Sequence, residues 1–159
     1  MSATASLGGR GAVVTGGGRG IGAAIATALA DAGAHLIVAA RTLAEIEGVA
    51  EAVRAGGARA WAVSCDVSDE AAVRALAARA REHFRSVGAG AVRTGAVDVL
   101  INAAGDGGAA PLERITLADW RLMLDAHATG TFLCTREFVP AMRERGFGRI
   151  VNIASTAGL

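Results

Sequence analysis

Runs of apolar residues alternate along this chain with segments in which apolar residues recur at helical spacing. The apolar runs are rich in valine, isoleucine and leucine, and they predict five strands: Gly11 to Thr15, Ala34 to Ala39, Arg59 to Cys65, Val97 to Asn102 and Arg149 to Ile153. Alternation of this kind is typical of a parallel sheet that helices cover on both faces. We therefore predict an α/β fold with a doubly wound parallel sheet, formed as a single domain over residues 1–159.

Polar capping residues and glycines bound the helices predicted between these strands. The helices run from Gly20 to Ala32, from Thr42 to about Gly56, from Ser68 through Phe84 and from Thr116 to about Arg145. Thr42 and Glu45 have the spacing of a capping box, and Ser68 and Thr116 are expected caps. The long fourth helix carries an inward stripe of Met123, His127, Thr131, Cys134 and Phe138. Two loops are expected, from Arg85 to Ala96 and from Asp106 to Pro111.

Composition narrows the possible partners. The chain is 52% hydrophobic but only 4% aromatic, with no tyrosine, so small aliphatic side chains must fill the core. Its net charge is +1 with both signs interspersed, which argues against nucleic-acid and membrane partners. No run reaches the length of a membrane span, and no signal peptide is evident. Cys65 and Cys134 are predicted to be buried thiols, so we expect a cytoplasmic protein without a metal site.

The segment between the first strand and the first helix carries the clearest chemistry. Residues 15–22 read Thr-Gly-Gly-Gly-Arg-Gly-Ile-Gly. Glycines allow a sharp turn and a close approach of the backbone to a pyrophosphate, while the start of a helix aims N–H groups at the anion. A plain turn in a chain with 22 glycines is the alternative. The order of strand, glycines and helix favours a dinucleotide-binding loop.

The end of the second strand bears on which dinucleotide is bound. Dinucleotide folds that bind NAD place an acidic residue there, whereas this chain has Arg41. A guanidinium can hold a 2′-phosphate that a carboxylate would repel, and Arg19 in the glycine loop adds a second positive charge. Either arginine alone could be a solvated surface charge, but together they point to NADP(H). The missing acid also disfavours an S-adenosylmethionine-dependent methyltransferase.

Taken together, these motifs resemble those of the short-chain dehydrogenase/reductase family, and they are most similar to the 3-oxoacyl-carrier-protein reductases. The glycine loop matches the family's Thr-Gly-x-x-x-Gly-x-Gly pattern, and residues 102–105 match its Asn-Asn-Ala-Gly stretch with Ala103 as the second residue. The resemblance implies that Asp66 and Val67 hold the adenine ring. The cofactor-binding candidates are Gly16, Gly18, Arg19, Gly20, Ile21, Gly22, Arg41, Asp66, Val67, Asn102, Ala104 and Gly105.

The resemblance also implies a catalytic arrangement, which this chain matches only in part. Ser155 falls at the position of the family's serine, which orients the substrate carbonyl, and His127 falls where the family has an asparagine that supports a water. His127 could hold that water, relay a proton itself, or be a satisfied core histidine. The family's tyrosine and lysine are expected beyond Ser155, whereas the chain stops at Leu159.

A methyltransferase or other Rossmann-like binder is a third possibility, which Arg41 and the context of Ser155 disfavour, and two functions are favoured over it. One is the cofactor-binding portion of an oxidoreductase that transfers a hydride between NADP(H) and a small carbonyl or alcohol substrate. The other is a catalytically silent dinucleotide-binding or interaction module, which the missing tyrosine and lysine favour. The expected Rossmann sheet is incomplete at its C-terminal edge, and a full-length form is expected to be a homo-oligomer.

Overall fold

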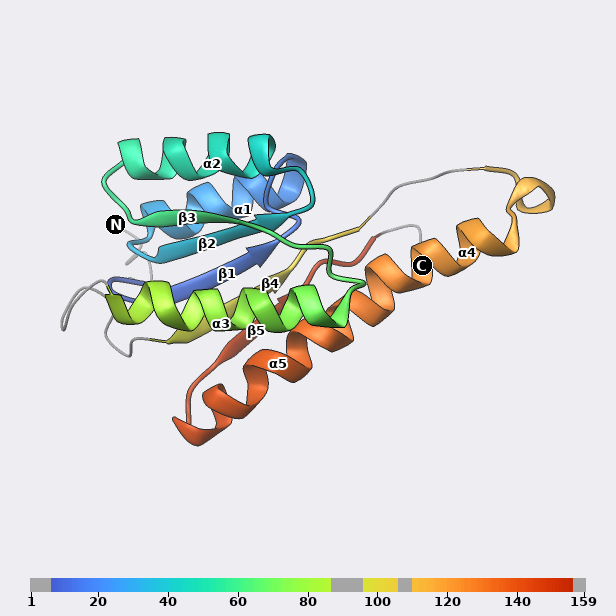
Figure 1. The fold of residues 1–159 in the computed structure, drawn as a ribbon. Coiled ribbons are helices and arrows are strands. Elements are labelled where there is room, and N and C mark those ends of the chain that lie inside the picture. The colour runs from blue at the N-terminus through green and yellow to red at the C-terminus, as the bar shows by residue number, and fades with distance from the viewer. Residues whose placement is uncertain (1–6, 87–95, 106–109, 156–159) are drawn as a thin grey trace.

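The computed structural model describes residues 7–86, 96–105 and 110–155 (Figure 1). A parallel five-stranded sheet has the order β3-β2-β1-β4-β5. The strands are β1 (Gly11–Thr15), β2 (His35–Ala40), β3 (Ala60–Ser64), β4 (Val97–Asn102) and β5 (Arg149–Asn152). The predicted doubly wound α/β fold is confirmed. From β1 the strand order runs to one side through β2 and β3, and then to the other side through β4 and β5. The boundary between β1 and β4 is a topological switch point, where a crevice opens at the carboxyl ends of the strands.

Helices lie on both faces of the sheet (Figure 1). The helices α1 (Gly20–Asp31) and α2 (Leu43–Ala55) cover one face, and α3 (Glu70–Ser86) and α5 (Gly130–Glu144) cover the other. A short 3-10 helix, η1 (Leu112–Arg114), precedes α4 (Leu117–Leu124), which extends beyond the sheet. No helix in the described part of the chain is long and apolar enough to span a membrane.

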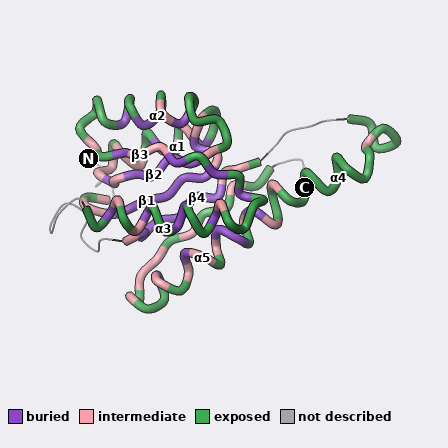
Figure 2. The backbone as a smooth tube through the Cα atoms, in the orientation of Figure 1, coloured by how far each residue is buried: buried purple, intermediate pink, exposed green. Residues whose placement is uncertain are grey.

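Side chains of successive strand residues point to opposite faces and build two cores. Val13 and Ile37 pack with α3 and α5, whereas Val14 and Val38 pack with α1 and α2. Figure 2 shows the central strands buried and the outer helix surfaces exposed. Phe84 and Phe138 are the aromatic residues among the buried hydrophobic residues of the described chain, so aliphatic side chains fill most of this interior.

The helix ends agree only in part with the predicted caps. Thr116 caps α4 in a capping box with Asp119, as expected, which lowers the pKa of the Asp119 carboxyl through hydrogen bonds from the Thr116 hydroxyl and N–H. Ser68 was the wrong cap for α3, because the carboxylate of Asp69 instead accepts from the N–H of Ala71 at 2.8 Å. Thr42 is the N-cap of α2 but makes no side-chain capping bond, so the predicted capping box with Glu45 does not form.

The single long fourth helix predicted from Thr116 to Arg145 is interrupted. A π-helical segment, η2 (Asp125–Thr129), separates α4 from α5 and contains His127. A π turn holds an extra residue and shifts the helical phase, so one stripe cannot stay inward along the whole length. Cys134 and Phe138 are buried as predicted, whereas His127 is exposed and Met123 is only half-buried.

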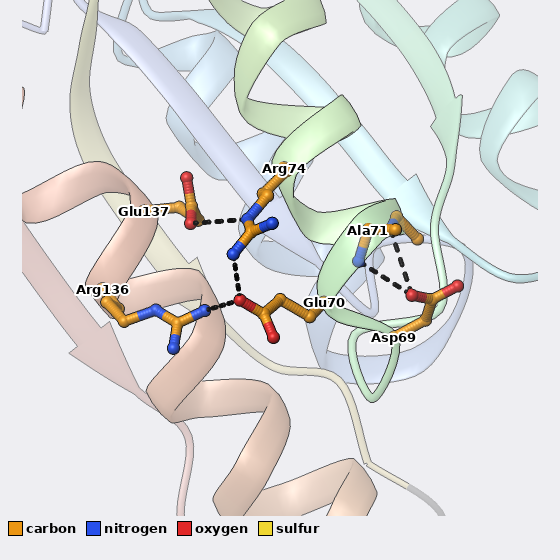
Figure 3. Close-up of polar contacts among 7 residues, drawn as sticks. Asp69, Glu70, Ala71, Arg74, Arg136 and Glu137 are labelled. Atoms are coloured by element: carbon orange, nitrogen blue, oxygen red, sulfur yellow. Dashed lines mark hydrogen bonds and ion pairs between the residues drawn. The ribbon is translucent and has the colours of Figure 1, made fainter.

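Ion pairs join α3 to α5 across the helix surface (Figure 3). Glu70 accepts from Arg74 within α3 and from Arg136 of α5 at 2.6 Å, and Arg74 lies 3.7 Å from Glu137 of α5. Shared partners make such a network more persistent than isolated surface pairs. It therefore helps to fix the orientation of α5, which continues into the π segment.

The strand β5 forms one edge of the sheet and is largely exposed, with Val151 46% exposed. The incomplete C-terminal edge of the predicted sheet is confirmed to this extent. The loops predicted over Arg85 to Ala96 and Asp106 to Pro111 fall mainly on residues 87–95 and 106–109, which lie outside the described residues.

Candidate functional site

A cleft of about 380 Å³ opens at the carboxyl ends of the central strands. The glycine loop after β1 forms one wall, and the ends of β2, β3 and β4 supply the others. The predicted residues that line it are Gly16, Gly18, Arg19, Gly20, Ile21, Gly22, Arg41, Asp66, Val67, Ala104 and Gly105. The structure therefore brings together all predicted cofactor-binding residues except Asn102 in one cavity.

Hydrogen bonds from the central strands hold the glycine loop in place. The buried hydroxyl of Thr15 donates to the carbonyl of Ile101 at 3.3 Å, and the N–H of Ala103 donates to the carbonyl of Thr15 at 3.2 Å. On the other side, the N–H of Gly17 donates to the carbonyl of Ala39 at 3.1 Å. The loop is thus fixed to both β2 and β4, so its backbone is preorganised.

Glycine is required at two positions of this loop. Gly16 has φ +67°, and a β-carbon there would lie 2.5 Å from the carbonyl oxygen of Ala103. A β-carbon on Gly22 would collide with the carbonyl oxygen of Gly16, because α1 begins directly against the turn. The first residues of α1 line the cleft, and the N-terminus of a helix suits an anion.

Two arginines border the same cleft. Arg19 is the N-cap of α1 and Arg41 directly follows β2, and both are exposed. The hydroxyl of Ser64 donates to the carbonyl of Arg41 at 3.3 Å, which ties this residue to the end of β3. The end of β2 carries no carboxylate of its own, and Arg41 supplies a positive charge there.

Asp66 is exposed and lines the cleft just after β3. Its carboxylate accepts from the Ser68 hydroxyl at 2.7 Å and from the Ser68 N–H at 3.0 Å. These bonds lower the pKa of Asp66, and the nearby positive charge of Arg41 adds to the shift, so the group is ionised at neutral pH. Beside it, the side chain of Val67 packs against Gly130, where a β-carbon would lie 2.5 Å from a Val67 methyl group.

Asn102 is buried at the end of β4 and does not line the cleft. Its amide nitrogen donates to Asn152 Oδ1 at 2.8 Å and to Thr135 Oγ1 at 3.3 Å, which joins β4 to β5 and α5. The Asn102 side-chain oxygen is buried without a partner among the described residues. In this structure Asn102 therefore supports the strand ends and does not line the cavity.

The two predicted catalytic residues lie near the cleft but not on its lining. The His127 ring packs against Gly105, because a β-carbon added to Gly105 would lie 2.2 Å from His127 Cε1 and 2.8 Å from its Nδ1. Its neighbour Ala126 lines the cleft. Ser155 follows β5 and is exposed. The core-histidine interpretation of His127 is wrong for this structure, because the side chain is exposed.

Several lining residues were not anticipated from the sequence. They are Ala40, Thr42, Glu45, Cys65, Ala103, Ala126 and Ile153. Five of the seven end a strand or lie within two residues after one, so their position in the sheet could have indicated them. The sequence predicts a capping box for Glu45, whereas the structure places Glu45 on the cleft wall.

Both cysteines are buried free thiols, as predicted. Burial raises the pKa of Cys65 to about 11, with nearby carboxylates adding to the shift, and raises that of Cys134 to about 12. Both shifts favour the protonated thiol over the reactive thiolate. Among the described residues, no cluster of three or more His, Cys, Asp and Glu side chains could hold a metal.

The fold is a doubly wound α/β arrangement, and a glycine-rich turn lines the cleft at its strand ends. Residues 10–159 match the family model described as short chain dehydrogenase. The chain therefore belongs to the short-chain dehydrogenase family, which confirms the resemblance seen in the motifs.

Relatives at moderate identity are oxidoreductases of this family. The chain is 39% identical over 146 residues to the short-chain reductase protein NovJ of Streptomyces niveus, covering 92% of this chain and 52% of that protein. It is 40% identical over 153 residues to D-threitol dehydrogenase of Mycolicibacterium smegmatis, covering 95% and 54%.

A solved structure gives a comparable match. A metagenomic short-chain oxidoreductase in complex with NADP superposes with a TM-score of 0.84 at 36% identity, covering 96% of this chain and 65% of that one. The chain spans about half the length of the curated relatives just named.

Proposed function

We propose that this chain is the cofactor-binding portion of an oxidoreductase that moves a hydride between NADP(H) and a small carbonyl or alcohol substrate. The observation that carries the proposal is the cleft in which a side-chain-free glycine turn and two arginines face one cavity at the strand ends. The family membership supports the reaction class, and the NADP-bound relative supports the cofactor.

The residues present fit such a dinucleotide. Gly16 and Gly22 let the turn pack directly against the backbone after β4 and against the start of α1. The turn lines the cleft next to the N-terminus of α1, where a pyrophosphate would bind. Asp66 and Val67 would hold the adenine ring at the end of β3, and Ala104 and Gly105 would border the nicotinamide half. When bound, the nicotinamide supplies the hydride chemistry.

Arg41 and Arg19 would bind the 2′-phosphate that distinguishes NADP(H) from NAD(H). Both line the cleft, and the hydrogen bond from Ser64 fixes the backbone of Arg41 beside it. A guanidinium can form two parallel charge-assisted bonds to phosphate oxygens. The absence of a carboxylate at the end of β2 removes the group that would otherwise favour a ribose hydroxyl.

Replacing Arg41 with alanine tests this assignment. We expect the affinity for NADPH to fall roughly 10- to 100-fold and the affinity for NADH to change less than about twofold, because charge-assisted bonds contribute about 1.5–3 kcal/mol. Isothermal titration calorimetry measures both. Arg79→Ala is the matched control, since it removes an exposed arginine from α3 that does not line the cleft. Equal losses for the two cofactors would contradict selection by Arg41.

Ser155 and His127 complete the proposal as the residues assigned to the substrate, on the strength of the positions that they match in the family. The Ser155 hydroxyl would orient the substrate oxygen, and His127 would either hold a water or relay a proton through its own imidazole. Exchange of His127 for asparagine separates the two roles in a turnover assay of the active enzyme. Retained turnover indicates a held water, and a large loss indicates that the imidazole proton is used.

The silent dinucleotide-binding module gives a different result in one experiment. Mixing the chain with NADPH and a panel of ketones and aldehydes, and following the absorbance of the reduced nicotinamide, measures turnover directly. If NADPH raises the melting temperature of this chain but no turnover is seen, the chain acts as a dinucleotide-binding module. A homo-oligomer and a cytoplasmic location remain expectations of the proposal, which size-exclusion chromatography and fractionation would test.

A further inference from the structure

Glu45 places a negative charge in the part of the cleft where the arginines lie. It belongs to the first turn of α2 and lines the cavity together with Arg19, Arg41 and Thr42. The expected capping role would have turned its carboxylate back toward the start of the helix, but Thr42 makes no side-chain capping bond. The side chain instead lies against the glycine loop.

The geometry of that contact is specific. A β-carbon added to Gly18 would lie 3.0 Å from Glu45 Cβ and 3.1 Å from its carboxylate oxygen Oε2. The carboxylate therefore lies over the loop residue that directly precedes Arg19. Glu45 is exposed, so its charge is available to a ligand that enters the cleft.

The other carboxylates in this region are engaged differently. Asp66, which also lines the cleft, is held by two hydrogen bonds from Ser68. Glu47, on the same helix as Glu45, pairs with Arg54 at 2.9 Å and does not line the cleft. Glu45 is thus the acidic side chain that reaches the glycine loop from α2.

We propose that Glu45 is a specificity-determining residue that weakens the hold of the cleft on a 2′-phosphate. This inference rests on the proposed function. A carboxylate close to a doubly charged phosphate raises its free energy in a partly desolvated cleft, whereas a ribose hydroxyl is not repelled. Glu45 therefore makes the ratio of NADP(H) to NAD(H) affinity smaller than Arg19 and Arg41 alone would produce. NAD(H) can then bind as a second cofactor.

Glu45→Gln tests this role while it preserves the shape of the side chain. Adenosine 2′,5′-bisphosphate and adenosine 5′-monophosphate are the ligands, because they differ at the 2′-phosphate and omit the nicotinamide. We expect calorimetry to show about a three- to tenfold gain in affinity for the bisphosphate and a change below about twofold for the monophosphate. The gain should shrink as salt rises from 50 to 500 mM, because salt screens the repulsion.

Glu47→Gln is the matched control, since it removes one negative charge from the same helix outside the cleft. It should alter neither affinity. Equal changes for both ligands in Glu45→Gln would overturn the inference and identify Glu45 as a ribose ligand, and unchanged affinities would also overturn it. If the unsubstituted chain binds neither NADPH nor NADH, the proposed function itself fails, which is a separate result from binding that is insensitive to Glu45.

Discussion

Asp98→Ala is expected to lower the free energy of unfolding by about 3 kcal/mol, a larger effect than that of any exposed charge in the chain. Asp98 is fully buried in β4. Its carboxylate accepts from the N–H of Gly11 at 3.3 Å and lies 3.6 Å from Arg10 and 3.7 Å from Arg145. Alanine would leave two partly buried guanidinium groups without their counter-charge, and would leave the Gly11 N–H without this acceptor.

The surrounding contacts make this cluster a tie between distant parts of the chain. Arg145, just after α5, also donates to the carbonyl of Val97 at 2.6 Å, and Arg10 stacks over the Phe147 ring at 4.0 Å. Loss of the carboxylate therefore loosens the start of β1 and the end of α5 together.

Thermal and urea unfolding measure the effect. A loss of about 3 kcal/mol corresponds to roughly 6–12 °C in melting temperature for a chain of this size. Asp98→Asn keeps the shape and an oxygen acceptor, so its smaller loss isolates the charge. Glu47→Ala breaks an exposed pair with Arg54 and should cost less than about 1 kcal/mol. Equal effects for Asp98→Ala and Glu47→Ala would show that the buried cluster does not stabilise the fold.

Gly16→Ala is expected to reduce the affinity for NADPH by about two orders of magnitude. Its φ of +67° costs an alanine about 1–2 kcal/mol. The added methyl group would also lie 2.5 Å from the carbonyl oxygen of Ala103 and 2.6 Å from the backbone nitrogen of Ala104. Backbone of β4 cannot move away without displacing the cleft wall, so strain and misplacement together reach roughly 3 kcal/mol, which is about 100-fold in affinity.

Alanine substitutions at two other glycines separate the effect of backbone strain from the effect of a steric clash. Gly20 has φ +55° with nothing within 4 Å of an added β-carbon, so Gly20→Ala should show strain alone and a smaller loss. Gly48 is exposed in the middle of α2, and an added β-carbon there would also meet nothing within 4 Å. Gly48→Ala should therefore stabilise the fold by about 0.5–1 kcal/mol without changing the affinity for NADPH. Calorimetry with NADPH and thermal unfolding measure the set. Wild-type affinity in Gly16→Ala would contradict the role assigned to the glycine turn.

Local patterns were enough to predict the fold and most of the cleft. Apolar runs set the strands, and Gly33, with φ +95°, ends the first helix region as expected of a left-handed terminator. The glycine loop and Arg41 line one cavity because, in a parallel sheet, the residues that follow the strands gather at one edge. The place of these residues directly after a strand was therefore enough to predict that they would line the cleft.

Features that depend on tertiary contacts were not predicted. The π segment at Asp125–Thr129 changes the helical phase by one residue, which periodicity cannot indicate because the apolar pattern continues on both sides. The contact of the His127 ring with Gly105 needs two segments to meet. Asp98 is a single acid in an apolar strand, and its partners Arg10 and Arg145 lie far away in sequence.

The central claim is that the cleft binds a nicotinamide dinucleotide and prefers the one that carries a 2′-phosphate. Side-by-side calorimetric titration of the unsubstituted chain with NADPH and NADH, at one salt concentration, tests it most directly. The structure predicts that both bind with one-to-one stoichiometry and that NADPH binds more tightly, by about tenfold, through Arg19 and Arg41. Tighter binding of NADH, or no heat from either cofactor, would contradict the account.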